Sequence, residues 1–152
     1  MKMFRHRVLA AIAFAVGAQF LTTIGVAAGY DDRDALAGAK EVKVAFDITT
    51  DDAKGLLGRL NIIDETRQSL IHQGVSPHFV LAFRGPATRL VQTDQSKIKP
   101  EDQETAAKIA AKLQEMRGAR GVENLEQCAV AIREQGTKAE DVVPAVKVVG
   151  NA

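Results

Sequence analysis

The chain has 152 residues, of which 46% are hydrophobic, and its 20 basic and 19 acidic residues give a formal net charge of +1. Both signs are scattered along the chain, which excludes a basic stripe for nucleic-acid binding, and the absence of Trp with a single Tyr excludes aromatic stacking platforms. A chain of this length suits one domain with one hydrophobic core.

The N-terminal segment has the three-part pattern of a secretory signal peptide. Its first seven residues hold three basic side chains and no acidic one, and an apolar run over 8–25 follows. Val26 and Ala28 then supply the small residues that precede a cleavage site. We therefore predict that residues 1–28 are a signal peptide and that the mature chain begins at Gly29. The alternative is an uncleaved anchor, because the same apolar stretch is long enough to span a bilayer.

Export would change the charge and the location of the mature chain. Loss of the three basic residues of the signal peptide changes the net charge from +1 to −2. The mature chain is then expected in the periplasm or outside the cell, without stable membrane association. We interpret residues 29–40 as a flexible lead-in and residues 41–152 as a single domain. The one cysteine, Cys128, has no partner for a disulfide within the chain, so the fold depends on its core.

Residues 41–48 (EVKVAFDI) alternate apolar and polar side chains, a pattern that predicts a strand. A helix should follow, with Thr49 or Thr50 as its N-cap and with apolar residues at near-helical spacing up to about Gln73. Gly74 is a natural helix end, because glycine readily adopts the left-handed conformation found there. The domain is thus predicted to open with a strand and a long helix.

The middle of the chain continues this alternation. Residues 79–83 (FVLAF) form a continuous apolar run, which is typical of a buried parallel strand, and residues 84–86 (RGP) end it. We interpret residues 87–99 (ATRLVQTDQSKIK) as a short strand or as an irregular loop of the kind found at active sites. Pro100 then favours the start of a helix that continues through residues 101–118.

The C-terminal part adds two more strands. Residues 122–128 (VENLEQC) predict a short strand, and residues 129–136 (AVAIREQG) predict a short helix that ends at a glycine. A helical or turn-like connection over 137–145 leads to a final strand over 146–150. Strands that alternate with helices indicate an α/β domain with a mostly parallel sheet of four to five strands.

The candidate site residues lie where predicted strands end. Asp47 lies at the end of the first strand, and Arg84 with Gly85 follows the second. Cys128 ends a later strand. Because the carboxyl ends of parallel strands meet at one edge, where α/β sheets bind ligands, these residues should come together. We predict that Asp47, Arg84 and Gly85 bind a ligand. Cys128 would be the reactive group.

The sequence position of Cys128 allows two roles, a reactive thiol or a structural cysteine. It comes directly before a predicted helix, and a helix N-terminus stabilises the thiolate, which is the nucleophilic form of cysteine. Arg84 could support this effect. The alternative is a buried, unreactive cysteine that fills a small space in the core. The sequence has no histidine or cysteine spacing typical of a metal site, so we predict neither a metal nor a cofactor.

Three stretches carry a resemblance to a known family: KVAFDITTDDAKGLLGRLNII, FVLAFRGPATRLV and ENLEQCAVAIREQGTKAEDVVPAVKVV. In order and spacing, from about Glu41 to Val149, they resemble the DsrE/DsrF-like family, in particular its small exported members. The resemblance implies a three-layer α/β/α fold and homo-oligomers, either trimers or hexamers. In the related sulfur-relay members, which include TusD-type proteins, the cysteine that matches Cys128 accepts sulfane sulfur as a persulfide and passes it on.

Three functions are therefore open. The first is a sulfur carrier or sulfurtransferase-like protein, which accepts sulfane sulfur on Cys128 and exchanges it with donor and acceptor proteins. The second is a non-enzymatic, oligomeric module that binds a small ligand and in which Cys128 is structural. The third is redox sensing, in which Cys128 is oxidised or pairs between two chains. The labelling rate of the folded protein's thiol separates them, because a buried structural cysteine reacts only on unfolding.

Overall fold

The computed structural model describes residue 32 and residues 34–152. The predicted signal peptide, residues 1–28, lies outside the described residues, as does part of the predicted lead-in, residues 29–40. The described end of this lead-in makes a turn, and its Leu36 packs against the core. Over the part of the chain that is described, no helix combines the length and apolarity needed to cross a membrane.

Among the described residues, four parallel strands form one sheet, in the order in which they occur in the chain. They are β1 (Glu41–Ile48), β2 (Ser76–Phe83), β3 (Val122–Cys128) and β4 (Lys147–Val149). β1 and β2 pair along their whole length, whereas β4 pairs only with the end of β3. The predicted fold class is confirmed: the parallel four-stranded sheet and its helices correspond to a three-layer α/β/α fold.

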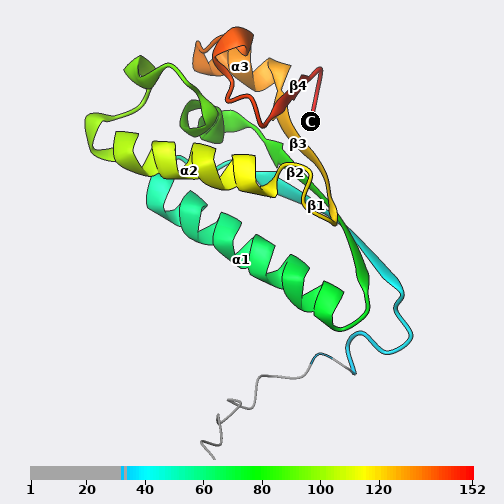
Figure 1. Ribbon diagram of the computed structural model, residues 1–152. Helices are drawn as coiled ribbons and strands as arrows, with labels where there is room; N and C mark the ends of the chain where they lie inside the picture. The colour runs from blue at the N-terminus through cyan, green and yellow to red at the C-terminus, as the bar shows by residue number, and fades with distance from the viewer. Residues whose placement is uncertain (1–31, 33) are drawn as a thin grey trace, which may run out of the picture. The chain divides into compact units, whose positions relative to one another are not determined.

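Helices connect the consecutive strands. The α-helices are α1 (Ala53–His72), α2 (Gln103–Met116) and α3 (Ala129–Gln135). Short 3-10 helices lie in two of the connections: η1 (Gly85–Val91), η2 (Gln95–Lys97) and η3 (Pro100–Asp102) between β2 and α2, and η4 (Ala139–Asp141) between α3 and β4. α1 and α2 pack against each other on the same side of the sheet (Figure 1). This placement follows from the strand order, because each new strand is added at the same edge of the sheet. Right-handed crossovers that all advance in one direction put their helices on the same face.

The core lies between the sheet and the helices α1 and α2. Alternate residues of β2 point toward these helices and are buried, and the helices meet them with apolar side chains at helical spacing. The buried residues include Phe79, Leu81 and Phe83 of β2, Leu56 and Leu60 of α1, and Ile109 and Leu113 of α2. Phe46 of β1 packs edge-on against Phe79, with ring centroids 5.0 Å apart. At about 1.5–3 kcal/mol for each side chain, this burial is the main stabilisation of the fold.

A buried ion-pair cluster ties α1 to α2. Asp64 of α1 is 5% exposed and accepts hydrogen bonds from Arg67 at 2.9 and 2.7 Å and from Lys112 of α2 at 2.8 Å. Burial raises the pKa of Asp64, but the hydrogen bonds and positive charges of Lys112 and Arg67 outweigh it and lower the pKa below its usual value. Because the carboxylate is withdrawn from water, its charge has to be balanced by both cations.

The ends of α1 differ in how well the sequence predicts them. The N-cap is Asp52, not one of the two threonines before it, because its Oδ1 accepts a hydrogen bond from the backbone N–H of Gly55 at 3.0 Å. The predicted end is confirmed within one residue, since α1 ends at His72 and Gln73 is its C-cap. Gly74 then has a φ of 78°, the left-handed conformation expected of a glycine at this point.

The segment 87–99 is not a strand but an irregular connection that contains the short 3-10 helices η1 and η2. Its first half belongs to η1, which packs against α2 and α3. The buried residues of η1 are Ala87, Thr88, Leu90 and Val91. Only Gln92 makes a strand-like bridge, an isolated one to Val142. The apolar side chains of this segment therefore complete the core.

Candidate functional site

The carboxyl ends of β1 and β2 carry a formed ion pair. Asp47 is the last but one residue of β1 and lies opposite Ala82 of β2. Arg84 follows β2 directly and donates two hydrogen bonds to Asp47, at 2.6 Å from Nε to Oδ1 and 2.5 Å from Nη2 to Oδ2. The hydrogen bonds from Arg84 lower the pKa of Asp47, although both side chains are about half exposed. The bidentate geometry holds the guanidinium at this edge of the sheet.

Gly85 has a backbone role in the site. Its φ is 53°, in the left-handed region that side-chain-bearing residues rarely adopt. It begins η1, so the chain turns directly after Arg84. The space beside Gly85 is open, since a Cβ there would meet only the Cβ of Thr49, at 3.9 Å. Gly85 thus serves to turn the chain at the end of β2.

Cys128 is the last residue of β3 and the N-cap residue of α3, and it is only 3% exposed. Burial raises the pKa of its thiol. Hydrogen bonds from the backbone N–H groups of Ala131, Ala152 and Val130 act in the opposite direction. The positive charge of Arg84 adds to them, and the net effect lowers the pKa of Cys128 below that of an ordinary cysteine. The surroundings of the sulfur therefore favour the thiolate.

Three of the four predicted site residues thus share one charged neighbourhood. Arg84 links Asp47 to Cys128, because Arg84 binds Asp47 directly and its positive charge lowers the pKa of Cys128. Gly85 contributes through the backbone turn. The gathering of these residues at one edge follows from the parallel strands, as the sequence predicts.

Residues after β4 complete the surroundings of Cys128, and the sequence prediction missed them. The thiol donates a hydrogen bond to Oδ1 of Asn151 across 3.7 Å, and the backbone N–H of Ala152 donates to the sulfur. A signal for them was present, because Val149 of β4 lies opposite Cys128 in the sheet. Residues that follow the last parallel strand emerge at the same edge as those that follow the others.

A buried polar cluster fixes the end of β3 beside η1. Gln127 is fully buried, and its Nε2 donates hydrogen bonds to Oγ1 of Thr88 at 2.9 Å and to the carbonyl of Cys128 at 3.1 Å. Gln92 in turn donates to the carbonyl of Thr88 at 2.9 Å. Because these bonds form where water is excluded, they hold the backbone of Cys128 in place against η1.

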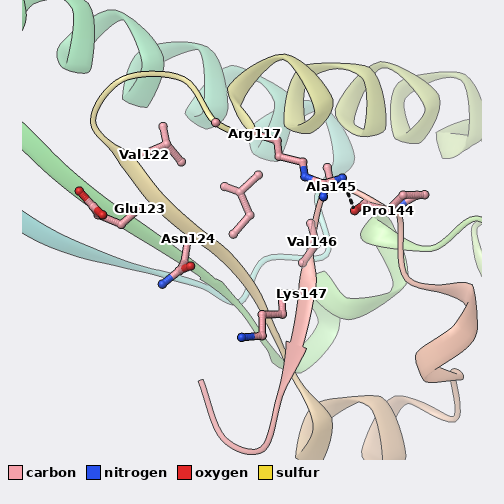
Figure 2. A pocket seen from close by; sticks show the side chains of 10 residues that line it. Arg117, Val122, Glu123, Asn124, Pro144, Ala145, Val146 and Lys147 are labelled. Atoms are coloured by element: carbon pink, nitrogen blue, oxygen red, sulfur yellow. Dashed lines mark hydrogen bonds between the residues drawn. The ribbon is translucent and has the colours of Figure 1, made fainter.

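A separate hollow lies along the first half of β3, which β4 does not reach (Figure 2). Arg117 lines one side and donates a hydrogen bond to the carbonyl of Pro144 at 3.0 Å, and Lys147 of β4 lines another (Figure 2). Its volume is about 190 Å³. Pockets for drug-sized ligands hold about 300–1,000 Å³, so this hollow is too small for one. The bond from Arg117 ties the segment before β4 to the end of α2.

Comparisons with known proteins bear on the fold. No protein-family model and no curated protein matches the chain. Among solved structures, the chain is similar to the protein of unknown function MTH1491 from Methanobacterium thermoautotrophicum, at 18% sequence identity and a TM-score of 0.53. The match covers 72% of this chain and 82% of that one. At this identity the likeness shows the fold alone, and that fold is the three-layer α/β/α architecture.

Proposed function

We propose that this chain is an exported DsrE/DsrF-like protein that carries sulfane sulfur on Cys128, as a sulfur carrier or sulfurtransferase-like protein. The main support is the lowered pKa of the Cys128 thiol: burial raises it, but hydrogen bonds from backbone N–H groups at the start of α3 and at Ala152, together with the charge of Arg84, outweigh this effect. A thiolate is the form of cysteine that attacks a sulfane sulfur, and these hydrogen bonds favour it. Further support comes from the position at the carboxyl edge of the sheet, beside Arg84.

The proposed step is a thiol–persulfide exchange. The thiolate of Cys128 attacks the terminal sulfur of a donor persulfide, R–S–SH, and a new S–S bond forms at Cys128. The S–S bond of the donor breaks, and its electron pair leaves with the donor thiolate, R–S⁻. No external oxidant or reductant takes part. An acceptor thiolate then removes the terminal sulfur from Cys128 by the same exchange.

The charged neighbourhood of Cys128 suits both ends of this exchange. The sulfur on Cys128 is anionic before the exchange, and the persulfide formed on it ionises readily afterwards, while the guanidinium of Arg84 is held at this edge by Asp47. The backbone N–H groups of Val130 and Ala131 belong to the first turn of α3 and help to lower the pKa of the thiol. Arg84 and the N–H groups would therefore both stabilise the anionic sulfur on Cys128.

Mass spectrometry after incubation with a small-molecule persulfide tests the proposal. We expect the wild-type chain to gain one sulfur atom that a reducing agent removes, with the added mass located on Cys128. Cys128→Ser is the matched control, because it keeps a small polar side chain and loses the thiol, and it should gain nothing. A wild-type thiol that still reacts with an alkylating agent after the incubation, but has gained no sulfur, would show that the proposal is wrong.

The second candidate is a non-enzymatic, oligomeric module that binds a small ligand and in which Cys128 is structural. The observation that favours it is the 3% exposure of Cys128. In this case the same incubation leaves the mass of the wild-type chain unchanged, and Cys128→Ser leaves assembly and ligand binding intact. The assembly expected from the family resemblance, a trimer or a hexamer, belongs to both candidates and can be measured by light scattering.

Export is part of the proposal as well. N-terminal sequencing of the protein recovered from the periplasm or the medium should give a chain that begins at Gly29, if residues 1–28 are a signal peptide. Recovery of the uncut chain from the membrane fraction would show instead that the apolar segment is kept as an anchor.

A further inference from the structure

β1 is an edge strand whose outer side is free among the described residues, since it pairs only with β2. The backbone N–H of Ser76 donates to the carbonyl of Lys40 at 2.9 Å, and that of Arg84 donates to the carbonyl of Ile48 at 3.0 Å. Even-numbered residues of β1 therefore direct their backbone groups toward β2, and the odd-numbered residues direct theirs outward. Such a row of unpaired N–H and C=O groups is a template for another strand.

The odd-numbered residues also carry the exposed side chains of β1: Glu41, Lys43, Ala45 and Asp47. If two copies pair through this edge about a two-fold axis, the position of the axis decides which charges meet. An axis through Ala45 puts Lys43 of each copy opposite Asp47 of the other. An axis through Val44 instead puts Glu41 opposite Asp47. An axis through Lys43 puts that lysine opposite itself.

We propose that two copies of this chain associate through β1, as antiparallel edge strands related by a two-fold axis at Ala45. The two sheets then join into one continuous sheet with four strands from each copy. This register forms about six hydrogen bonds between the outward backbone groups of residues 43–47, and it repeats the Lys43–Asp47 charge pairing on both sides of the axis. The small Ala45 side chains meet at the axis itself. A shift of the axis to Phe46 keeps the backbone bonds but loses the charge pairing.

The helix side of the same edge also fits a second copy. A groove of about 690 Å³ lies between β1 and α1, and Gly58 and Ile62 line it. Ile62 is 64% exposed, the one large hydrophobic side chain of the described residues that is mostly in solvent. Nothing lies within 4 Å of where a Cβ of Gly58 would be, so the groove is open there. Pairing through β1 brings the α1 helices of the two copies side by side, which covers Ile62.

Cysteine cross-linking tests the register. In a Cys128→Ser background, Ala45→Cys sets two thiols opposite each other at the axis, with Cα atoms about 5.5 Å apart, within the range of a disulfide. Lys43→Cys in the same background is the matched control, because its two copies lie about 14 Å apart along the antiparallel strands. Mild oxidation should convert most of the Ala45→Cys chain into a disulfide-linked dimer and leave the Lys43→Cys chain without a disulfide link. Cross-linking of Lys43→Cys, or of neither variant, overturns the proposal.

Sedimentation equilibrium of the wild-type chain gives a second, independent test. We expect a dimer, or a larger assembly with an even number of chains, whose dissociation constant rises at least about tenfold in Lys43→Glu, because both charge pairs become repulsive. Asp52→Asn, a change of one charge away from the edge, should leave the assembly unchanged. A monomer at all concentrations overturns the proposal, and that is the result expected if N-terminal residues of the chain cover β1. A trimer, or a dimer unaffected by Lys43→Glu, overturns it as well.

Discussion

The accessibility of Cys128 gives the sharpest prediction, because the residue is only 3% exposed and yet has to react if it carries sulfur. Part of what contacts the sulfur follows β4, namely Asn151, whose Oδ1 accepts the thiol hydrogen bond, and the backbone N–H of Ala152. β4 itself is only three residues long. We therefore expect that displacement of the residues after β4, without unfolding of the sheet, is enough to expose the thiol.

The size of the protection distinguishes this local opening from unfolding. Loss of the two tail contacts costs about 1–3 kcal/mol, at about 0.5–1.5 kcal/mol for each hydrogen bond. Since every 1.4 kcal/mol is a factor of ten, alkylation of folded Cys128 should be about 5-fold to 150-fold slower than that of a thiol in an unfolded chain. Global unfolding of a domain costs about 5–15 kcal/mol, which corresponds to protection of about 4,000-fold or more.

The assay is the rate of iodoacetamide labelling, followed by mass spectrometry over a series of urea concentrations below the unfolding transition. Local opening exposes little surface, so the rate should depend weakly on urea. Asn151→Ala should label faster than the wild-type chain, whereas Asn124→Ala, an exposed change elsewhere on β3, should not. A rate that rises with urea as steeply as global unfolding does, with protection above about 4,000-fold, would mean that Cys128 is exposed only by unfolding and would favour a structural cysteine.

Two further changes test the effects of charged side chains, one on the pKa of Cys128 and one on the stability of the fold. Arg84→Gln removes a positive charge that lowers the pKa of Cys128, so the pH midpoint of alkylation should move upward; an unchanged midpoint would mean that the backbone N–H groups act alone. Asp64→Asn leaves Lys112 without its main buried partner, and urea denaturation should show a loss of about 2–4 kcal/mol. Because the pKa of Asp64 is lowered in the folded state, its contribution to stability is present above the pKa of the unfolded chain and is lost as the pH falls through the folded value. The difference in stability between wild type and Asp64→Asn should therefore shrink in acid.

Local patterns predict most of the strands and helices of this fold. The bounds of β1 are as predicted, because its side chains alternate and one face meets the core. The junction between β3 and α3 at Cys128 is also as predicted, and so is the end of α3, where Gly136 adopts the left-handed conformation. The segment 87–99 was not predictable in this way. Its burial depends on contacts with α2 and α3, which are distant in the sequence.

The site was predictable only in part for a similar reason. Parallel strand order is enough to bring Asp47, Arg84 and Cys128 to one edge, and the structure places them there. The contact between Cys128 and Asn151 spans 23 residues and depends on how the chain continues after β4. Short-range periodicity carries no information about such a contact.

One topological fact links the proposed site and the proposed interface. Because the strands follow one another in a single direction across the sheet, β1 is left as an edge over its whole length, and its carboxyl end belongs to the site. Asp47 lies in both places, since it holds Arg84 within the chain and would face Lys43 of a second copy. Lys43→Glu should then weaken the dimer alone, and Arg84→Gln should change the thiol alone. Asp47→Asn should affect both, and an Asp47→Asn chain that dimerises as tightly as the wild type would show that the axis does not pass through Ala45.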